Sequence, residues 1–107
     1  MTDVVIVLTT VADNEQAETL ARQFVEERLA ACVSVHPAML SFYRWKGQIE
    51  REAERQLVIK TTSDKLEALE TRLRSLHPYD LPEFLVLTVD RGSAAYLDWV
   101  AAQTRPT

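Results

Sequence analysis

Two long extended segments around a short turn lie in the middle of the chain, and they limit its folds more than any other feature. Residues 33–45 and 48–62 are rich in the β-branched and aromatic residues that favour strands. Between them, Lys46-Gly47 is typical of a hairpin turn, because glycine adopts positive φ without steric cost. Pro37 lies inside the first segment and cannot donate to a ladder, so it marks a sheet edge or a bulge.

The length of this hairpin predicts assembly. A typical strand has about 5–6 residues, and the strands expected at residues 4–8 and 84–89 match that length. The two central segments are about twice as long, so the distal part of the hairpin has no neighbour within one chain. Bare hairpins are marginally stable in water, and their open edges pair with other chains. We therefore expect a second copy to cover the hairpin; the alternative is that it curls back over its own core.

Aromatic side chains cluster around the turn of the hairpin. Phe42, Tyr43, Trp45 and Ile49 all lie within a few residues of it. Large apolar side chains on a protruding arm indicate a partner surface, so we expect these four residues at an interface between subunits. The first strand is apolar on both faces while both long helices cover only one, and an oligomer is the economical way to cover the other.

The remaining elements complete a mixed α+β pattern. Apolar residues recur at helical spacing in residues 15–31 and again after Asp64, until His77-Pro78 ends the second helix. Asp13 or Asn14 is expected to cap the first helix and Asp64 the second. A short final helix follows Gly92-Ser93, with aromatic residues expected to serve in packing. The order is βαββαβ plus a terminal helix, the ferredoxin-like arrangement with both main helices on one face.

Composition excludes several classes of protein. The 107 residues suit one domain, residues 1–107, and the lone Cys32 fits a reducing compartment. The net charge is -4, and basic residues alternate with acidic ones, as in residues 50–55, which are typical of a solvated surface. Nucleic-acid-binding proteins usually carry a basic stripe instead. No apolar run approaches the length of a membrane span, so we expect a cytoplasmic protein with neither nucleic acid nor membrane as partner.

Four segments, in this order along the chain, carry a resemblance to a known family. They are residues 29–33 (LAACV), 41–47 (SFYRWKG), 57–62 (LVIKTT) and 77–83 (HPYDLPE), of which the last is the most specific. Over nearly the whole chain the sequence resembles the CutA family of divalent-cation-tolerance proteins. The resemblance implies a homotrimer similar in plan to the PII signalling proteins, with hairpins crossing between subunits. It also implies a response to copper and other divalent metals, and no established enzymatic activity; animal relatives are associated with anchoring acetylcholinesterase.

Departures from the family pattern bear on copper. Ser34, His36 and Pro37-Ala38 replace the usual Asn, aliphatic residue and Pro-Gly. Some bacterial relatives bind copper through a cysteine and two adjacent histidines; the corresponding positions here are Thr9, Leu76 and His77. Only His77 remains as a candidate ligand, so copper or another divalent cation is expected to bind weakly. The alternative role of His77 is to end the helix and interact with its dipole.

The residues also suggest a small-molecule cleft between subunits. Lys60 lies among apolar neighbours, so its amine needs a partner such as Asp80, Glu83 or a bound anion. With Cys32 and Tyr79, these residues form the predicted ligand-binding cleft. The alternatives are a Lys60 that snorkels to the sheet edge and a Cys32 that is a small buried apolar residue.

Three other functions compete with a metal-responsive trimer. An enzyme using Cys32 and His77 lacks any visible triad or oxyanion signature, so we expect no catalytic residues. An RNA-binding domain of similar topology is disfavoured by the acidic balance. A structural or signalling interaction module, which holds a partner or a small ligand at its subunit boundaries, stays open as the alternative.

Overall fold

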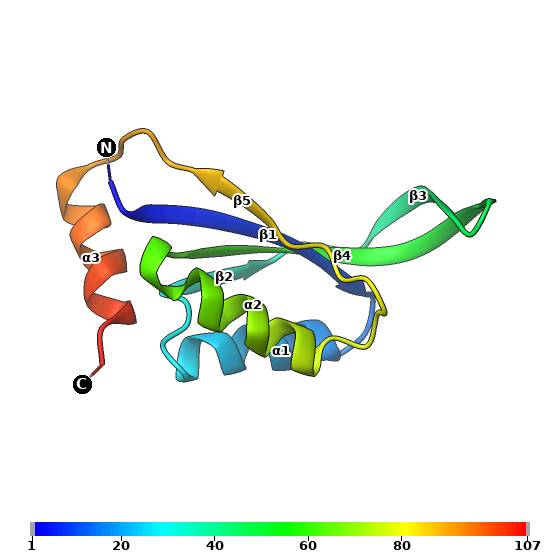
Figure 1. The fold of residues 1–107 in the computed structure, drawn as a ribbon, viewed down its shortest axis with the longest axis horizontal. Coiled ribbons are helices and arrows are strands. Elements are labelled where there is room, and N and C mark those ends of the chain that lie inside the picture. The colour runs from blue at the N-terminus through cyan, green and yellow to red at the C-terminus, as the bar shows by residue number, and fades with distance from the viewer. Residues whose placement is uncertain (1, 107) are drawn as a thin grey trace.

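The computed structural model describes residues 2–106 and shows a mixed α+β fold. An antiparallel sheet has the strand order β2-β4-β1-β5, and β3 pairs with the far end of β4 (Figure 1). The elements are β1 (Val4–Ala12), α1 (Gln16–Glu26), β2 (Cys32–Val35), β3 (Met39–Trp45), β4 (Gln48–Thr62), the 3-10 turn η1 (Ser63–Lys65), α2 (Leu66–Leu76), β5 (Leu85–Thr88) and α3 (Ala94–Thr104). The predicted mixed α+β fold is confirmed, and the elements follow the predicted βαββαβ order with a terminal helix except that two strands, β2 and β3, replace the predicted second strand.

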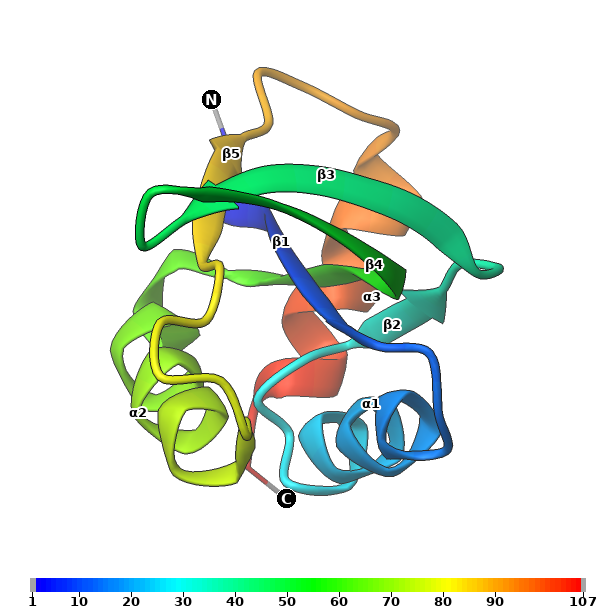
Figure 2. The same ribbon diagram turned by 90° about the vertical axis from the view of Figure 1, so that its right-hand side faces the viewer.

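Helices α1 and α2 cover one face of the sheet, and the core lies between them and the strands (Figure 2). Alternate side chains of β1 point into this core, and so do alternate side chains in the part of β4 that pairs with β1. Its fully buried members come from every layer: Val7, Val11, Leu57, Ile59, Phe24, Leu69 and Leu73. The helical periodicity identified the helix faces that pack here.

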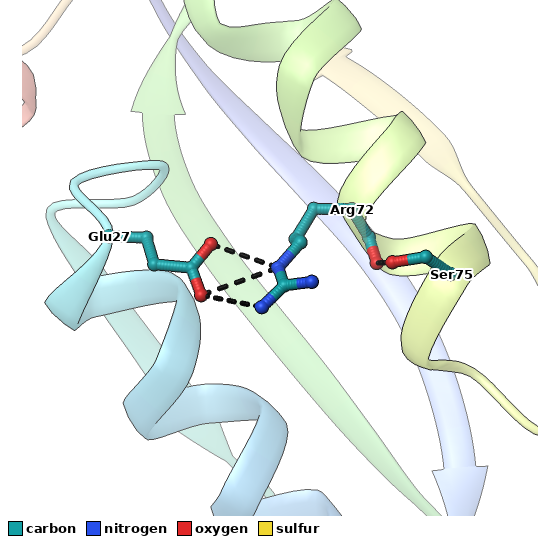
Figure 3. Close-up of polar contacts among 3 residues, drawn as sticks. All are labelled: Glu27, Arg72 and Ser75. Carbon is teal, nitrogen blue, oxygen red and sulfur yellow. Dashed lines mark hydrogen bonds and ion pairs between the residues drawn. The ribbon is translucent and has the colours of Figure 1, made fainter.

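A bidentate ion pair joins the two helices at their outer surface. Arg72 of α2 donates from Nε and Nη2 to the carboxylate of Glu27, which follows α1, with donor–acceptor distances of 2.9 Å (Figure 3). This hydrogen bond holds the pKa of Glu27 below its usual range and raises that of Arg72. The hydroxyl of Ser75 donates to the carbonyl of Arg72 in the same turn.

Helix α3 closes the end of the sheet opposite the hairpin (Figure 1). Its Val100 packs against Val4 and Ala31 in a second, smaller core. The side chain of Ser93 accepts a hydrogen bond from the Tyr96 amide, which caps the helix where the sequence predicted its start.

The central hairpin has the predicted turn and the predicted second strand, but its first strand is broken. Lys46 and Gly47 both have positive φ, 51° and 79°, which is the pattern of a type I′ turn. β4 spans the predicted residues 48–62. The expected single strand over 33–45 is wrong, because the chain leaves the ladder between β2 and β3, at the segment containing Pro37.

Other boundaries also differ from the prediction. β1 has nine residues instead of the five expected, because it stays paired with β4 as far as Ala12 opposite Glu54. Helix α1 ends early, at Glu26, where Arg28 follows with φ of 58°. Asn14 accepts a hydrogen bond from the Gln16 amide, but the cap position of α1 is held by Glu15, whose side chain makes no capping bond. Asp64 lies inside the 3-10 turn and not at the cap of α2.

Within residues 2–106, no helix is long and apolar enough to cross a membrane.

Candidate functional site

Cys32 and Lys60 form the first group of predicted cleft residues. They are directly opposite each other on β2 and β4, so their side chains lie on the same face of the sheet, away from α1 and α2. Lys60 Nζ donates to the Tyr96 hydroxyl at 3.3 Å and lies 5.5 Å from the centre of its ring. Tyr96 therefore supplies the neutral, aromatic partner of the Lys60 ammonium within one chain.

The loop between α2 and β5 carries the second group. The hydroxyl of Tyr79 donates to Glu54 Oε2 at 2.7 Å, and Glu54 is only 5% exposed. Burial, and then the hydrogen bond to Glu54, raise the pKa of Tyr79. Glu83 Oε2 is buried without a hydrogen-bond partner among the described residues. Burial, and then the nearby Glu54 charge, raise the pKa of Glu83.

One chain does not bring the five predicted cleft residues together. Lys60 and Glu54 are six positions apart on β4, which corresponds to about 20 Å at the rise of a strand. Cys32 stays with Lys60, whereas Tyr79 and Glu83 lie near Glu54, and Asp80 is exposed on the same loop.

His77 is buried and both of its ring nitrogens are hydrogen-bonded. Nε2 lies 2.8 Å from the carbonyl oxygen of Thr10, and Nδ1 accepts from the Tyr79 amide at 3.2 Å. A carbonyl only accepts, so Nε2 carries the proton of a neutral imidazole. His77 as a whole is 7% exposed, and its ring packs on the Tyr79 ring, with 4.6 Å between centroids. The backbone of His77 turns extended after α2, as the helix-ending role predicted.

The metal-binding chemistry of this region is limited. Imidazole is a suitable ligand for copper, but His77 has no free nitrogen in this arrangement. Across residues 2–106, no three side chains of His, Cys, Asp or Glu are grouped so that they would hold a metal ion. His77 therefore fits a metal only after it gives up one of its two hydrogen bonds.

The hairpin residues predicted to form an interface are all exposed in the single chain. Phe42 and Ile49 are 65% and 63% exposed, and Tyr43 and Trp45 are also exposed. Arg51 lies over the Phe42 ring at 6.0 Å. The hairpin extends away from the rest of the molecule (Figure 1) and does not curl back over the core, so that alternative is wrong for the single chain.

Sequence reasoning missed two residues of this region. Glu54 belongs to the alternating charged run at residues 50–55, which predicted a solvated surface, yet it is buried beneath Tyr79. Tyr96 was expected to serve in packing, but it is 42% exposed and contacts Lys60.

Known proteins resemble this chain over nearly its whole length. Residues 5–103 match the family described as CutA1 divalent ion tolerance protein. The divalent-cation tolerance protein CutA of Thermus thermophilus is 43% identical over 99 residues, which cover 92% of this chain and 96% of that protein. The crystal structure of CutA from Xylella fastidiosa has a TM-score of 0.93 at 43% identity, covering 97% of this chain and 100% of that one. CutA from Synechococcus elongatus has a TM-score of 0.92 at 47% identity, covering 98% and 93%.

The agreement in sequence and fold covers the hairpin, the loop before β5 and the terminal helix alike, and the chain therefore belongs to the CutA1 divalent ion tolerance protein family.

Proposed function

We propose that this chain acts as a homotrimer in the cellular response to divalent metal ions. The observation that carries the proposal is the sheet face opposite α1 and α2, where helix α3 contacts only the end near Val4 and Lys60. Its exposed or half-buried apolar side chains come from three neighbouring strands: Ile6, Leu8, Val58, Leu85 and Leu87. A contiguous apolar face of this kind on a soluble protein marks an interaction surface, and its continuation into the exposed hairpin gives a second copy one extended surface to cover.

The open edges of the sheet support a ring. Strands β2 and β5 lie at opposite edges of the path β2-β4-β1-β5, and β3 pairs only with β4. Different edges on one subunit favour head-to-tail contacts, which close into a ring when the rotation permits. In a trimer of the PII-like kind, hairpins cross between subunits, and each edge strand pairs with a strand of another subunit.

A boundary between subunits also gives the predicted cleft a physical basis. Lys60 and Cys32 lie about 20 Å along β4 from the Tyr79 and Glu83 group. We propose that one copy supplies Cys32 and Lys60 and the next supplies Tyr79, Asp80 and Glu83. A buried carboxylate needs a cation or a proton, and an ammonium from a neighbour would meet that need at Glu83. Small-molecule sites form preferentially at such boundaries.

Copper, or another divalent cation, binds weakly in this proposal, through the imidazole of His77. Weak binding follows from the displaced hydrogen bond and from the lack of a second nearby histidine. Only one other histidine, the exposed His36, is present in the sequence, and it provides a matched control.

The test is copper titration calorimetry on the purified oligomer. Wild type and His36→Ala are expected to bind copper alike, while His77→Ala loses the binding. Equal binding by wild type and His77→Ala would remove the metal role assigned to this residue. Sedimentation of each variant shows whether the oligomer is intact.

The second candidate function is a structural or signalling interaction module without catalysis, located in the cytoplasm. The exposed apolar hairpin tip, with Phe42 and Ile49 more than half exposed, favours it. In that case a partner or small ligand is held at the subunit boundaries. Its binding would survive His77→Ala but would be lost in the Lys60→Ala variant if it depends on the cleft.

A further inference from the structure

The carboxyl of Glu83 lies in surroundings that suit a neutral group better than a negative charge. Its Oε2 atom is buried and has no hydrogen-bond partner among the described residues. The charge that acts on it from another element is that of Glu54 of β4, which is only 5% exposed. Tyr79 donates its hydroxyl hydrogen to Glu54, at 2.7 Å, and Tyr43 and Glu52 of the hairpin lie near Tyr79. These surrounding groups are all acids or phenols.

Of the two carboxyls, Glu83 is the one that keeps a proton in a single subunit. Glu54 accepts the Tyr79 hydroxyl, and a hydrogen bond to the charged form of a carboxyl favours that form. Glu83 Oε2 has no such donor, and the negative charge of Glu54 disfavours a second charge beside it. Neither carboxylate has an ion-pair partner within residues 2–106. Burial and the charge of Glu54 therefore raise the pKa of Glu83.

We propose that assembly of the subunits is linked to the release of a proton from Glu83. The carboxyl is protonated in a single subunit and becomes ionised when the ammonium of Lys60 from the next subunit faces it. The inference rests on the trimer and the cleft proposed above and adds their regulation by pH. Lys60 of the same chain cannot act in this way, because about 20 Å of β4 separate it from Glu54, which is beyond the range of a screened charge.

The direction of the pH effect follows from this linkage. An opposite charge at contact distance lowers the pKa of a carboxyl, so Glu83 binds fewer protons in the assembled protein than in a single subunit. Rising pH then favours assembly, and the effect levels off once the pH exceeds the raised pKa of the single subunit. Because a trimer releases up to about three protons, its overall dissociation constant should fall by up to about a thousandfold per pH unit within this window.

NMR titration of the Glu83 side-chain carboxyl carbon in the intact oligomer tests the pairing. Glu83→Gln removes this signal and so assigns it. Lys60→Met removes the ammonium but keeps an unbranched apolar side chain. In the wild-type oligomer, Glu83 is expected to titrate at least about one pH unit lower than in the Lys60→Met oligomer. Lys65→Met is the matched control, because it removes an ammonium from the 3-10 turn before α2, and its Glu83 should titrate as in wild type.

The pH dependence of dissociation is a second measurement, which also serves if Lys60→Met does not assemble. Sedimentation of a dilution series between about pH 5 and pH 8 keeps ordinary carboxyls ionised throughout. Wild type is expected to dissociate more readily at pH 5 than at pH 8, and Glu83→Gln should lose most of this difference. Histidines ordinarily titrate in the same range, but both proteins contain the same two, so the difference between the proteins belongs to Glu83.

The outcomes distinguish this inference from the proposed function. A lower titration of Glu83 in wild type than in Lys60→Met, with Lys65→Met like wild type, supports proton release on assembly. If Glu83 titrates at the same pH in the wild-type and Lys60→Met oligomers, the linkage is overturned and the trimer stands. If Lys60→Met does not assemble, an equal pH dependence of dissociation in wild type and Glu83→Gln overturns the linkage instead. A wild-type protein that sediments as a single subunit overturns both proposals.

Discussion

Leu8 of β1 and Leu85 of β5 are directly opposite each other on the sheet face that α1 and α2 leave uncovered. Leu85 is 54% exposed in the single chain, and Leu87, two residues further along β5, is 48% exposed. Alternation along a strand places both on the same face. The pair belongs to the apolar face that the proposed trimer would bury.

Replacing Leu85 by glutamate is expected to break the assembly. An uncompensated charge buried in an interface costs about 3–5 kcal/mol, so the subunit dissociation constant should rise by more than about 100-fold. Sedimentation velocity across a dilution series measures the change. Val25→Glu is the control, since Val25 is 42% exposed on α1, on the helical side of the molecule, and should leave the oligomer intact. Equal dissociation of both variants would contradict this use of the open face.

The buried carboxyl of Glu83 predicts a dependence of stability on pH. Its pKa is raised above the ordinary 4.5 by burial and by the charge of Glu54. A group with a raised pKa contributes its stability fully below the unfolded value and loses it as the pH rises through the folded value. In a dissociated subunit, which lacks the neighbouring ammonium, ionised Glu83 therefore destabilises the fold near neutral pH, and Glu83→Gln should gain stability at pH 7 but not at about pH 4.

Urea unfolding of wild type and Glu83→Gln at both pH values, under conditions in which the subunits are dissociated, checks this difference. Asp80→Asn is a suitable control, since Asp80 is exposed on the same loop. A gain that is the same at pH 4 and pH 7 would show that the charge of Glu83 is not its source.

Two buried threonines predict opposite effects of the same substitution. Thr9 and Thr61 are both 0% exposed, but only Thr61 has a partner for its hydroxyl among the described residues, the Leu29 carbonyl at 2.7 Å. Thr9→Val should stabilise the fold by about 1 kcal/mol, because valine has nearly the same shape as threonine but lacks the unpaired buried hydroxyl. Thr61→Val should destabilise it by about 1–3 kcal/mol, since it leaves the half-buried Leu29 carbonyl without this donor.

Chemical denaturation of the two valine variants beside wild type measures both effects. If Thr9→Val destabilises the fold as much as Thr61→Val does, the Thr9 hydroxyl makes a hydrogen bond in the folded protein, which contradicts the prediction.

The ion pair between Glu27 and Arg72 should contribute little and should depend on salt and pH. Both side chains are 37% exposed, and pairs of that kind are screened by solvent. A double-mutant cycle with Glu27→Gln and Arg72→Gln is expected to give a small favourable coupling that weakens with added salt. The lowered pKa of Glu27 means that the coupling is present above pH 4.5 and is lost as the pH falls further.

The pair Arg74–Glu70, whose side chains are 70% and 41% exposed, provides the comparison and should couple less. A coupling at Glu27–Arg72 that persists in high salt would show that the bidentate geometry is better shielded than its exposure indicates (Figure 3).

Local pattern predicted those parts of the fold that local chemistry decides. The turn at Lys46-Gly47, the long β4 and the end of α2 at His77 follow from glycine, from β-branched residues and from the proline at 78. The break between β2 and β3 was signalled by Pro37 but was assigned to a bulge or an edge within one strand. The extra length of β1 was missed because it depends on pairing with β4, a contact between distant parts of the chain.

The candidate site was less predictable for the same reason. Cys32 and Lys60 become neighbours only through strand register, and Glu54 becomes buried only because Tyr79 folds over it from another loop. Neither relationship has a local sequence signal. The sequence suggested five residues for one cleft, but it did not show that a single chain divides them into two separate groups.

In the proposed trimer, further copies of the same chain cover the bare sheet face and the protruding hairpin. Sedimentation equilibrium of the wild-type protein at micromolar concentration measures whether they do. The expected result is a single species with three times the mass of one chain, stable on dilution. A well-folded single subunit at that concentration would contradict the account.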